Sequence, residues 1–408
     1  MNEQTHDRIY DLVLVGATGF AGSLVAEYLA SHSLSEGIRI ALAGRSRSRL
    51  EELRARLPGA FDLAELDLLK RASVDALVQK TRVVIAAAGP YRKYGSLLVA
   101  SCARHGTHYV DLAGETPWMR RMILEHHEEA QNRGACLVHA CGYDSIPSDL
   151  GVLFLRTVMQ KLDRGEPEAI RFVAGKTEGG LSGGTVASML GMLREAASDA
   201  ETRAALQDPD CLIPDPPRTP VRQKRRRYDP WLRAWTVPFV MESVNSRVVR
   251  RTNALSGMPL GPAPDYRELI TFGSGPLGFL KSYLASLGTG VLFLLLLLPP
   301  TRYLLSQLVL PKPGQGPRVA REGRGHFNAT LTGYKAAKSP TPPTRITVSA
   351  DRDPGYGATA IMIAEAALLL CDQTAAGTVQ AGFQTPATAF GLPLVERLTT
   401  AGVRFVPE

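Results

Sequence analysis

The sequence predicts an α/β fold, in which an N-terminal Rossmann domain with a doubly wound parallel sheet precedes a second, α+β domain containing a mixed sheet. Three observations lead to this prediction. A glycine-rich turn joins an apolar run to a segment with helical spacing near the start of the chain. Strand-like and helix-like segments then alternate as far as residue 150. Further strand-like segments follow, and 408 residues suffice for two domains with cores of their own.

The first strand, turn and helix lie in YDLVLVGATGFAG, residues 10–22. Gly16, Gly19 and Gly22 follow the strand at three-residue intervals, a spacing that presents backbone N–H groups and a helix dipole to a pyrophosphate. Gly16 permits the tight turn, Gly19 the approach of the phosphates, and Gly22 the close packing of helix on strand. Three further residues of the same loop complete the predicted dinucleotide contacts: Ala17, Thr18 and Phe20. The alternative is a tight strand-to-helix connection in some other α/β protein.

The second strand, residues 38–44, indicates which dinucleotide is bound. NAD sites usually place a carboxylate after this strand, where it holds the ribose 2′-hydroxyl. Here Arg45 and Ser46 follow the strand, and no acid appears before Glu51. A guanidinium matches a 2′-phosphate in charge and in bidentate geometry. We therefore predict NADP(H), held by Arg45 with help from Ser46.

The remaining elements of this domain alternate regularly. Asp67 ends the third strand, residues 61–67, on the adenine side, and the fourth strand runs over 83–91 into a Gly-Pro turn. The end of the fourth strand should line the nicotinamide half of the cofactor. Its lining residues are Ala88, Gly89, Pro90 and Tyr91. Helices are predicted over 71–79, 95–105 and 117–133, and strands over 108–114 and 135–140.

The second half is predicted to contain strands at 169–177, 246–255, 326–334 and 344–350. Residues 356–371 and 393–401 have the spacing of helices. These segments suggest three parts: a Rossmann domain over 1–150, an α+β domain over 151–352, and C-terminal helices over 353–408 that pack back on the body.

One apolar segment, residues 272–311, departs from the pattern of a soluble enzyme. Its first arm carries a single charge, Lys281, before Pro299 and Pro300, and a second apolar arm, residues 303–311, follows. A single transmembrane span, a membrane-dipping hairpin and a buried core helix are the three alternatives. Strand-like segments on both sides would share one sheet, which disfavours a single crossing. We therefore expect monotopic or hairpin insertion.

A basic run accompanies this segment. Ten Lys or Arg lie between Arg218 and Arg251, with their densest stretch at 222–227, beside Trp231 and Trp235. This pattern suits an anionic membrane or lipid surface, and a solvated loop is the alternative. A nucleic-acid partner is not expected, because the net charge of +8 is modest and no recognition motif accompanies it.

The N-terminal residues and the cysteines indicate a cytoplasmic protein. The first residues are polar, so no signal peptide is expected, and the five cysteines fit no zinc spacing and are expected to be reduced. His139 and His326 are expected to be unpaired, and no metal site is predicted. The predicted location is cytoplasmic, peripheral or monotopic on the membrane face.

The segment HACGYDSIPSDLG, residues 139–151, opens a helix for which Ser148 or Asp149 is the expected N-cap. Together with GATGFAG, AGRS, AAAGPY and YVDLAGE, it resembles the saccharopine dehydrogenase-like oxidoreductases. The branch that includes the trans-acting enoyl reductases is the more similar one. Segments 238–255, 353–370 and 385–403 extend this resemblance over nearly the whole chain.

The resemblance implies an NADP-binding Rossmann domain, a substrate cleft between the domains and a possible homodimer. The long apolar segment suits a hydrophobic acyl substrate, presented either by a carrier or by the membrane. We therefore expect reduction of a C=C bond in a long-chain lipid or polyketide acyl group. A saccharopine-type amino-acid dehydrogenase and a non-catalytic NADP-binding protein at a lipid surface are the alternatives.

The candidate catalytic residues lie where strands end. Tyr143 is a possible proton donor, Asp144 and Ser145 possible orienting or cofactor-binding groups, and Glu115 follows the fifth strand. Each has a structural alternative, which is capping of the following helix for Asp144 and Ser145 and packing on the nicotinamide for Tyr91. Water is an alternative proton source.

Overall fold

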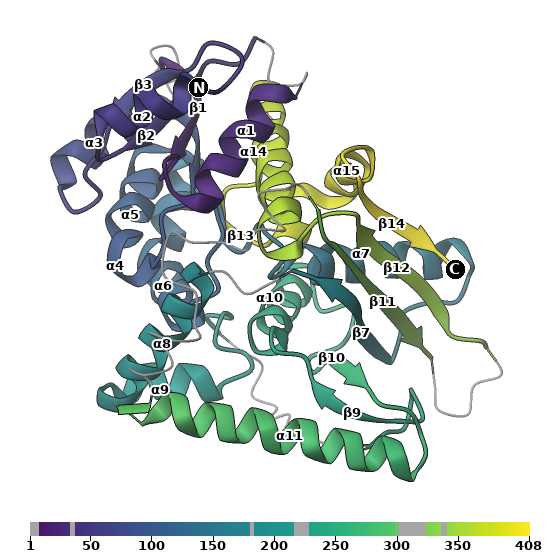
Figure 1. Ribbon diagram of the computed structural model, residues 1–408. Helices are drawn as coiled ribbons and strands as arrows, with labels where there is room; N and C mark the ends of the chain where they lie inside the picture. The colour runs from purple at the N-terminus through teal and green to yellow at the C-terminus, as the bar shows by residue number, and fades with distance from the viewer. Residues whose placement is uncertain are drawn as a thin grey trace.

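Two seven-stranded sheets organise the chain, with helices around both (Figure 1). They are seen in a computed structural model that describes residues 8–32, 37–179, 183–215, 228–298, 300–301, 324–335 and 341–408. The basic stretch 222–227 and the second apolar arm, 303–311, lie outside these residues.

The first sheet is parallel throughout, in the order β13-β6-β5-β4-β1-β2-β3. The predicted doubly wound fold is therefore confirmed, with the switch point between β1 and β4. Its strands are β1 (Tyr10–Val15), β2 (Ile40–Gly44), β3 (Asp62–Glu65), β4 (Thr81–Ala86), β5 (His108–Asp111), β6 (Cys136–Val138) and β13 (Gly382–Gln384). The helices that accompany them are α1 (Phe20–Ser31), α2 (Arg47–Arg54), α3 (Arg71–Val78), α4 (Tyr91–Tyr94), α5 (Ser96–His105), α6 (Thr116–Arg133) and α7 (Ile146–Lys161).

Strand β1 shows why this sheet needs helices on both faces. Leu12 and Leu14 point to one face and Val13 and Val15 to the other, and all four are almost completely buried. A strand buried on both faces reads as a continuous apolar run, and this is the pattern from which it was predicted.

The second sheet is mixed, in the order β14-β12-β11-β7-β10-β9-β8. Only β10 and β7 run parallel, and the other neighbours are antiparallel. This confirms the predicted mixed sheet. Its strands are β7 (Ala169–Glu178), β8 (Tyr228–Asp229), β9 (Ala234–Pro238), β10 (Asp265–Thr271), β11 (His326–Tyr334), β12 (Thr344–Ala350) and β14 (Val403–Pro407). Helices α8 (Gly183–Ser198), α9 (Ala200–Gln207), α10 (Glu242–Leu255) and α11 (Pro276–Leu297) belong to the same half.

The strand predicted over 246–255 is wrong, because these residues form most of helix α10. Two β-branched valines suggest a strand locally, but the helix buries three arginines among partners distant in sequence. Arg250 forms a two-bond ion pair with Asp210, and Arg251 donates to the carbonyls of Leu212 and Phe383. Arg247, Arg250 and Arg251 are buried and therefore cannot serve as surface cations of the basic run.

The C-terminal part ties the two sheets together. A π-helical turn, Pro354–Ala358, leads into α14 (Thr359–Ala376), which packs on α1 and β4. Strand β13 then joins the parallel sheet, α15 (Pro386–Thr400) follows, and β14 joins the mixed sheet. Only helices were predicted for residues 353–408, and the structure shows two short strands there as well, β13 and β14.

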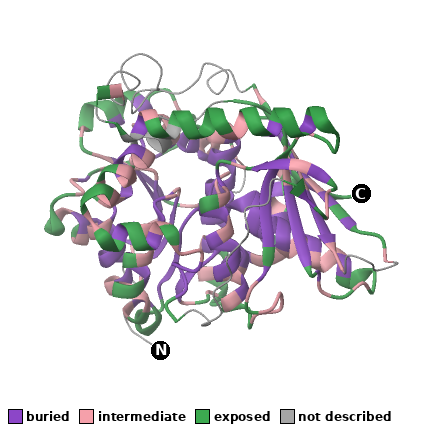
Figure 2. Ribbon diagram, turned by 90° about the horizontal axis from the view of Figure 1, so that it is seen from below, coloured by how far each residue is buried: buried purple, intermediate pink, exposed green. Residues whose placement is uncertain are grey.

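Helix α11 lies along the outside of the molecule, where most of its residues are exposed (Figures 1 and 2). Among the described residues, two helical stretches are long and apolar enough to cross a membrane. The one that ends in α14 is 83% buried, whereas the stretch in α11 is 12% buried. The alternative of a buried core helix is thus wrong for α11. Strands β10 before it and β11 after it both pair with β7, as the argument against a single crossing requires.

Candidate active site

The glycine turn after β1 has the geometry of a dinucleotide-binding loop. Gly16 has φ = 81°, and a Cβ there would lie 2.9 Å from the Cβ of Ala88 at the end of β4. A Cβ on Gly22 would lie 2.2 Å from the Gly16 carbonyl oxygen, so helix α1 packs on the turn only with glycine there. Gly19 begins α1 without a side-chain cap, which leaves N–H groups of the first turn available to a pyrophosphate.

The end of β2 presents one guanidinium without a partner. Arg45 is exposed. Across the described ranges, its guanidinium forms no ion pair with an acid and no hydrogen bond to a carbonyl. Arg47, in contrast, pairs with Glu51 and donates to the carbonyl of Leu63. Ser46 is the N-cap of α2 and accepts a hydrogen bond from the N–H of Arg49. Arg45 is thus placed to bind a 2′-phosphate, as predicted, while Ser46 is already partly engaged.

A hollow of about 540 Å³ adjoins the glycine turn, between α1 and α2. Its lining includes Thr18, Gly19, Phe20, Arg49 and Arg56. The ring of Phe20 meets that of Tyr356 edge-on, with 4.4 Å between the centroids. On the far side of β2, Asp67 accepts from the N–H of Leu69 and closes the turn before α3.

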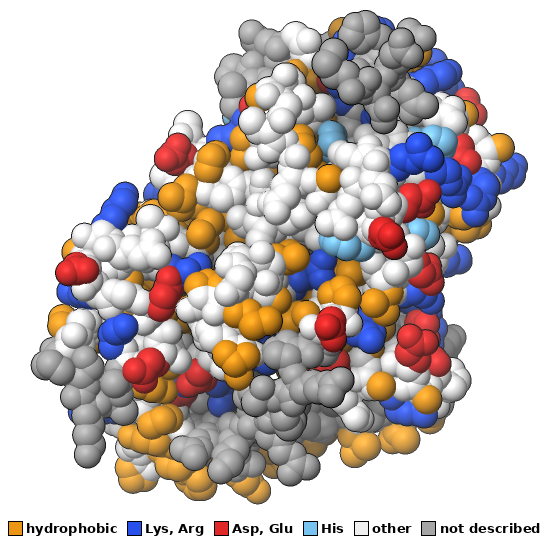
Figure 3. All heavy atoms as spheres, turned by 180° about the vertical axis from the view of Figure 1, so that it is seen from behind, with side chains coloured by type: hydrophobic (Ala, Val, Ile, Leu, Met, Phe, Trp, Pro, Cys, Tyr) orange, Lys and Arg blue, Asp and Glu red, His pale blue; other side chains and the backbone are white. Residues whose placement is uncertain are grey.

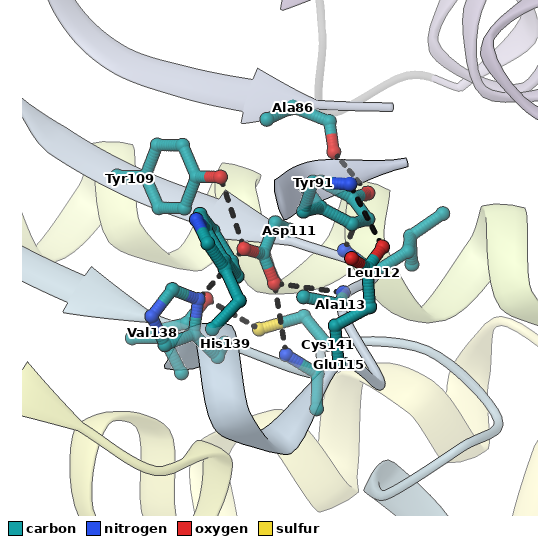
Figure 4. A network of polar contacts seen from close by, with 12 residues as sticks. Ala86, Tyr91, Tyr109, Asp111, Leu112, Ala113, Glu115, Val138, His139 and Cys141 are labelled. Carbon is teal, nitrogen blue, oxygen red and sulfur yellow. Dashed lines mark hydrogen bonds and ion pairs between the residues drawn. The ribbon is translucent and has the colours of Figure 1, made fainter. Parts of the chain in front are cut away.

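The end of β4 is braced by Tyr91 (Figure 4). Gly89 and Pro90 are joined by a cis peptide bond, and Ala88 contacts the glycine turn. The Tyr91 hydroxyl donates to the carbonyl of Ala86 and accepts from the N–H of Leu112, which joins the ends of β4 and β5. Burial raises the pKa of this phenol well above its usual value. These bonds give Tyr91 a structural task, whether or not it also touches a nicotinamide.

Glu115 is completely buried, and three donors meet its carboxylate. The N–H groups of Tyr91 and Arg92 donate to it at 2.8 and 3.0 Å, and the Ser188 hydroxyl of α8 donates at 2.7 Å. Glu115 therefore caps the short helix α4 and links it to α8. A catalytic role for Glu115 stays a prediction, and these contacts support a positioning role.

Behind these residues lies a polar network that the sequence did not reveal (Figure 4). Asp111, at the end of β5, pairs with Nδ1 of His139 at 2.7 Å and accepts from the hydroxyl of Tyr109. It also accepts from the N–H groups of Ala113 and Ala140. The expectation of an unpaired His139 is wrong, and His326 likewise lies 3.4 Å from Glu178. The network fixes the two loops that leave β5 and β6.

The loop after β6 carries the candidate proton donors. Tyr143 donates its N–H to the hydroxyl of Thr359, and its ring meets that of Phe327 at 4.8 Å. Burial raises the pKa of this phenol above its usual value, so it is a weaker acid than a free tyrosine. Ser145 occupies the N-cap of α7 and donates to Oδ1 of Asn245.

Asp144 differs from the other acids of this edge. It is half-buried, and nothing in the described part of the chain donates a hydrogen bond to its carboxylate. Burial raises its pKa to about 6. Its Oδ2 lies close to Gly114, where a Cβ would be 3.6 Å away. Asp144 is thus a carboxyl that gains or loses a proton near pH 6. It lies where β5 and β6 end.

The predicted N-caps of α7 are wrong, because the helix begins at Ile146 and both residues lie in its first turn. Ser148 donates to Glu268 at 2.6 Å, and Asp149 accepts from the N–H of Ala387. Burial raises the pKa of Asp149 to about 7. Both side chains are buried and serve the packing of α7 instead.

The predicted site residues therefore gather along the carboxyl edge of the parallel sheet, the edge where open α/β sheets bind ligands. The glycine turn and Ala88 are in contact, and Tyr91 and Glu115 are hydrogen-bonded. Asp144 lies beside Gly114, next in sequence to Glu115. Within the described ranges, no three His, Cys, Asp or Glu side chains group as metal ligands.

Comparison with known proteins agrees with this geometry. The family described as saccharopine dehydrogenase NADP binding domain matches residues 12–138. A putative trans-acting enoyl reductase of Mycobacterium tuberculosis is 38% identical, with 97% of each chain covered. A trans-acting enoyl reductase of Mycobacterium bovis is 36% identical over 97% of each chain.

A solved structure extends the likeness to the fold. The apo saccharopine dehydrogenase of Saccharomyces cerevisiae superposes with a TM-score of 0.54 at 13% identity, over 98% of this chain and 100% of that one. The glycine turn, the free Arg45 and the matched NADP-binding domain together identify the cofactor as NADP. The chain belongs to the saccharopine dehydrogenase-like family, among the trans-acting enoyl reductases, and is an NADP-dependent oxidoreductase.

Proposed function

We propose that this oxidoreductase reduces a C=C bond conjugated to a carbonyl in a hydrophobic acyl substrate. The observation that carries the proposal is full-length similarity to proteins named trans-acting enoyl reductases. The free carboxyl of Asp144 at the cofactor edge supports it, because such a reduction requires a proton as well as a hydride.

NADPH, held by the glycine turn and Arg45, would supply a hydride for the β-carbon of the substrate. The electron pair of the double bond then moves toward the carbonyl oxygen, and the α-carbon takes a proton to complete the saturated product. Asp144, with a pKa near 6, is the group we assign to deliver that proton. Tyr143 has a raised pKa and is better suited to donate a hydrogen bond to the enolate oxygen.

A saccharopine-type reaction is less well supported. Such a substrate carries several carboxylates, which arginines would have to bind. Near Glu115 a small hollow of about 50 Å³ is lined by Arg92, Arg120 and Arg121. Arg92 already pairs with Glu195, however, and Arg120 donates to the carbonyl of Cys211. The hollow is too small for an amino-acid substrate, and two of its three cations are engaged.

The substrate we propose is a long acyl chain of lipid or polyketide type, presented by a carrier or by the membrane. The apolar helix α11 in the second half of the chain supports this choice. We place the enzyme at the cytoplasmic face of a membrane, where such chains are found. A homodimer remains a prediction from the family resemblance.

The test is NADPH oxidation by the purified full chain with long-chain enoyl thioesters, followed by mass spectrometry of the acyl product. Saccharopine with NADP+ is assayed in parallel. We expect turnover of the enoyl thioester, with the product heavier by two hydrogens. Turnover of saccharopine alone contradicts the proposed substrate. Tight NADPH binding without turnover of either supports a non-catalytic binding protein instead.

A further inference from the structure

In its first half, helix α11 faces its own protein mainly with small side chains, and along its length large apolar side chains face outward. On the inner side of the helix, Gly278 and Ser282 are buried, and Ala285 and Ser286 are half-buried. The large side chains that are 43% or more exposed are Leu277, Phe279, Leu280, Tyr283, Leu284, Leu287, Val291, Leu292 and Leu294. A surface helix in water normally buries its apolar stripe and exposes its polar one. In α11, by contrast, most of the large apolar side chains are exposed.

The helix is nevertheless attached to the body near both ends. The ring of Phe279 meets that of Trp235 on β9 edge-on at 4.9 Å. Toward the other end, Leu296 packs with Leu190 of α8. Its 22 residues therefore lie along the surface over about 33 Å, instead of projecting from it (Figure 1). Figure 3 shows hydrophobic side chains along the lower rim, where α11 runs in Figure 1.

We propose that the outward face of α11 docks on a lipid surface, with the helix axis in the plane of the membrane. At 3.6 residues per turn, the exposed apolar side chains cover more than half of the helix circumference. A single partner helix covers only a narrow seam of such a helix, whereas the acyl region of a bilayer surrounds the whole exposed arc. Lys281 is the only charged residue of α11, and its long side chain can reach the headgroup layer.

The aromatic residues near the start of the helix, and the basic sequence that precedes one of them, favour anionic lipid. Tyr228, whose ring lies 5.2 Å from that of Trp235, directly follows the basic residues 222–227 in the sequence. In the sequence, a run of positive charge thus ends directly before Tyr228, which shares the partner Trp235 with Phe279. Tyrosine and tryptophan are enriched at membrane interfaces, and adjoining basic segments are attracted to anionic headgroups.

The sheet topology favours this orientation. The chain enters α11 from β10 and returns to the mixed sheet at β11, and both strands pair with β7. A helix lying flat satisfies this connection, while one that crossed the bilayer would have to return before β11. This proposal rests on the membrane location in the proposed function and deepens it, but it depends on no assumption about the reaction.

The experiment is flotation of the full chain with vesicles of phosphatidylcholine, with and without phosphatidylglycerol, in the absence of substrate. We expect binding, and stronger binding to the anionic vesicles. The variant Leu280→Ser/Leu284→Ser/Leu287→Ser should reduce the vesicle-bound fraction about tenfold or more, because three large side chains no longer enter lipid. The matched control, Leu69→Ser/Leu124→Ser/Leu162→Ser, removes leucines that are 49% to 58% exposed on other elements and should bind like the native chain.

NADPH affinity, measured for all three proteins, should be equal and shows that each is folded. Native protein that floats with neither vesicle contradicts the proposal, as does equal binding by the two triple variants. A lipid-free dimer that the α11 variant converts into a monomer overturns it in favour of a second copy as the occupant. None of these outcomes depends on whether an enoyl thioester is turned over.

Discussion

At the scale of single residues, we expect Arg45 to decide the cofactor preference. The variant Arg45→Ala removes the guanidinium that is free to bind a 2′-phosphate. A hydrogen bond to a charged group contributes about 1.5–3 kcal/mol, so the Kd for NADPH should rise about 10- to 100-fold. The Kd for NADH, which has no 2′-phosphate, should change little. Fluorescence titration with both cofactors measures the difference.

The control is Arg47→Ala, because Arg47 is engaged by Glu51 and the Leu63 carbonyl. It should leave both affinities nearly unchanged. Equal loss of NADPH and NADH in Arg45→Ala would show that Arg45 supports the fold of the loop instead of recognising the phosphate.

Asp144 should set the pH dependence of turnover. A proton donor acts in its protonated form, and burial raises the pKa of this carboxyl to about 6. With an enoyl substrate that is turned over, kcat should therefore fall as the pH rises through about 6. Asp144→Asn should lower kcat by about 100-fold or more and remove this dependence, while the Kd for NADPH stays the same. If the variant keeps the native pH profile, the proton comes from water or from another residue.

The role of a residue was predictable where it depends on the local backbone conformation. It was not predictable where it depends on hydrogen-bond partners that are distant in the sequence. Gly16 was predicted because its positive φ and close packing follow from a strand–turn–helix pattern. The donors to Glu115 come from residues 23, 24 and 73 positions away, and Asp111 and His139 are 28 apart. A single sequence gives no signal for such pairs.

At the scale of elements, the Rossmann half was predicted well because its buried strands are continuous apolar runs. The second half was predicted less well. Strand β10 carries Arg267 and Glu268, both buried, and charged residues conceal its alternation. Helix α10 looks like a strand around Val248 and Val249, and only its arginine contacts to Asp210 and Leu212 reveal why it is a helix.

The two attachments of α11 should act separately. Leu190→Ala removes the contact with Leu296, and Phe279→Ala removes the contact with Trp235. Because large-to-small substitutions loosen the packing only locally in such small clusters, we expect faster amide hydrogen exchange near 290–297 in the first variant. In the second, faster exchange should appear near 276–284. Each variant is the control for the other, and equal changes along the whole helix would contradict separate attachments.

At the scale of the whole molecule, the two sheets are joined by contacts between distant segments. Glu268 of β10 accepts from Ser148 of α7, Asn245 of α10 and Tyr266 of its own strand. The C-terminal residues add β13 to one sheet and β14 to the other. Two different sheets were predictable from the change in pattern after residue 150. Their joining was not, because a three-residue strand has too few side chains to show a period.

The buried carboxyl of Glu268 makes this junction sensitive to pH. Burial raises its pKa from 4.5 to about 7, with a further contribution from the nearby Glu242 carboxylate. The folded chain therefore binds this proton more tightly than the unfolded chain. The resulting stabilisation is complete below about pH 4.5 and is lost as the pH rises through about 7. A pKa difference of this size corresponds to at most ~3 kcal/mol in the free energy of unfolding.

Glu268→Gln keeps the shape of the side chain but cannot ionise. Urea unfolding of both proteins at about pH 5 and about pH 8 should show the native chain losing up to ~3 kcal/mol relative to the variant. Taking the difference between the two proteins removes the contributions of Asp149 and of His108, whose pKa burial lowers to about 4. If the difference is the same at both pH values, Glu268 is ionised throughout. Its three donors, Ser148, Asn245 and Tyr266, then outweigh the cost of burying its charge.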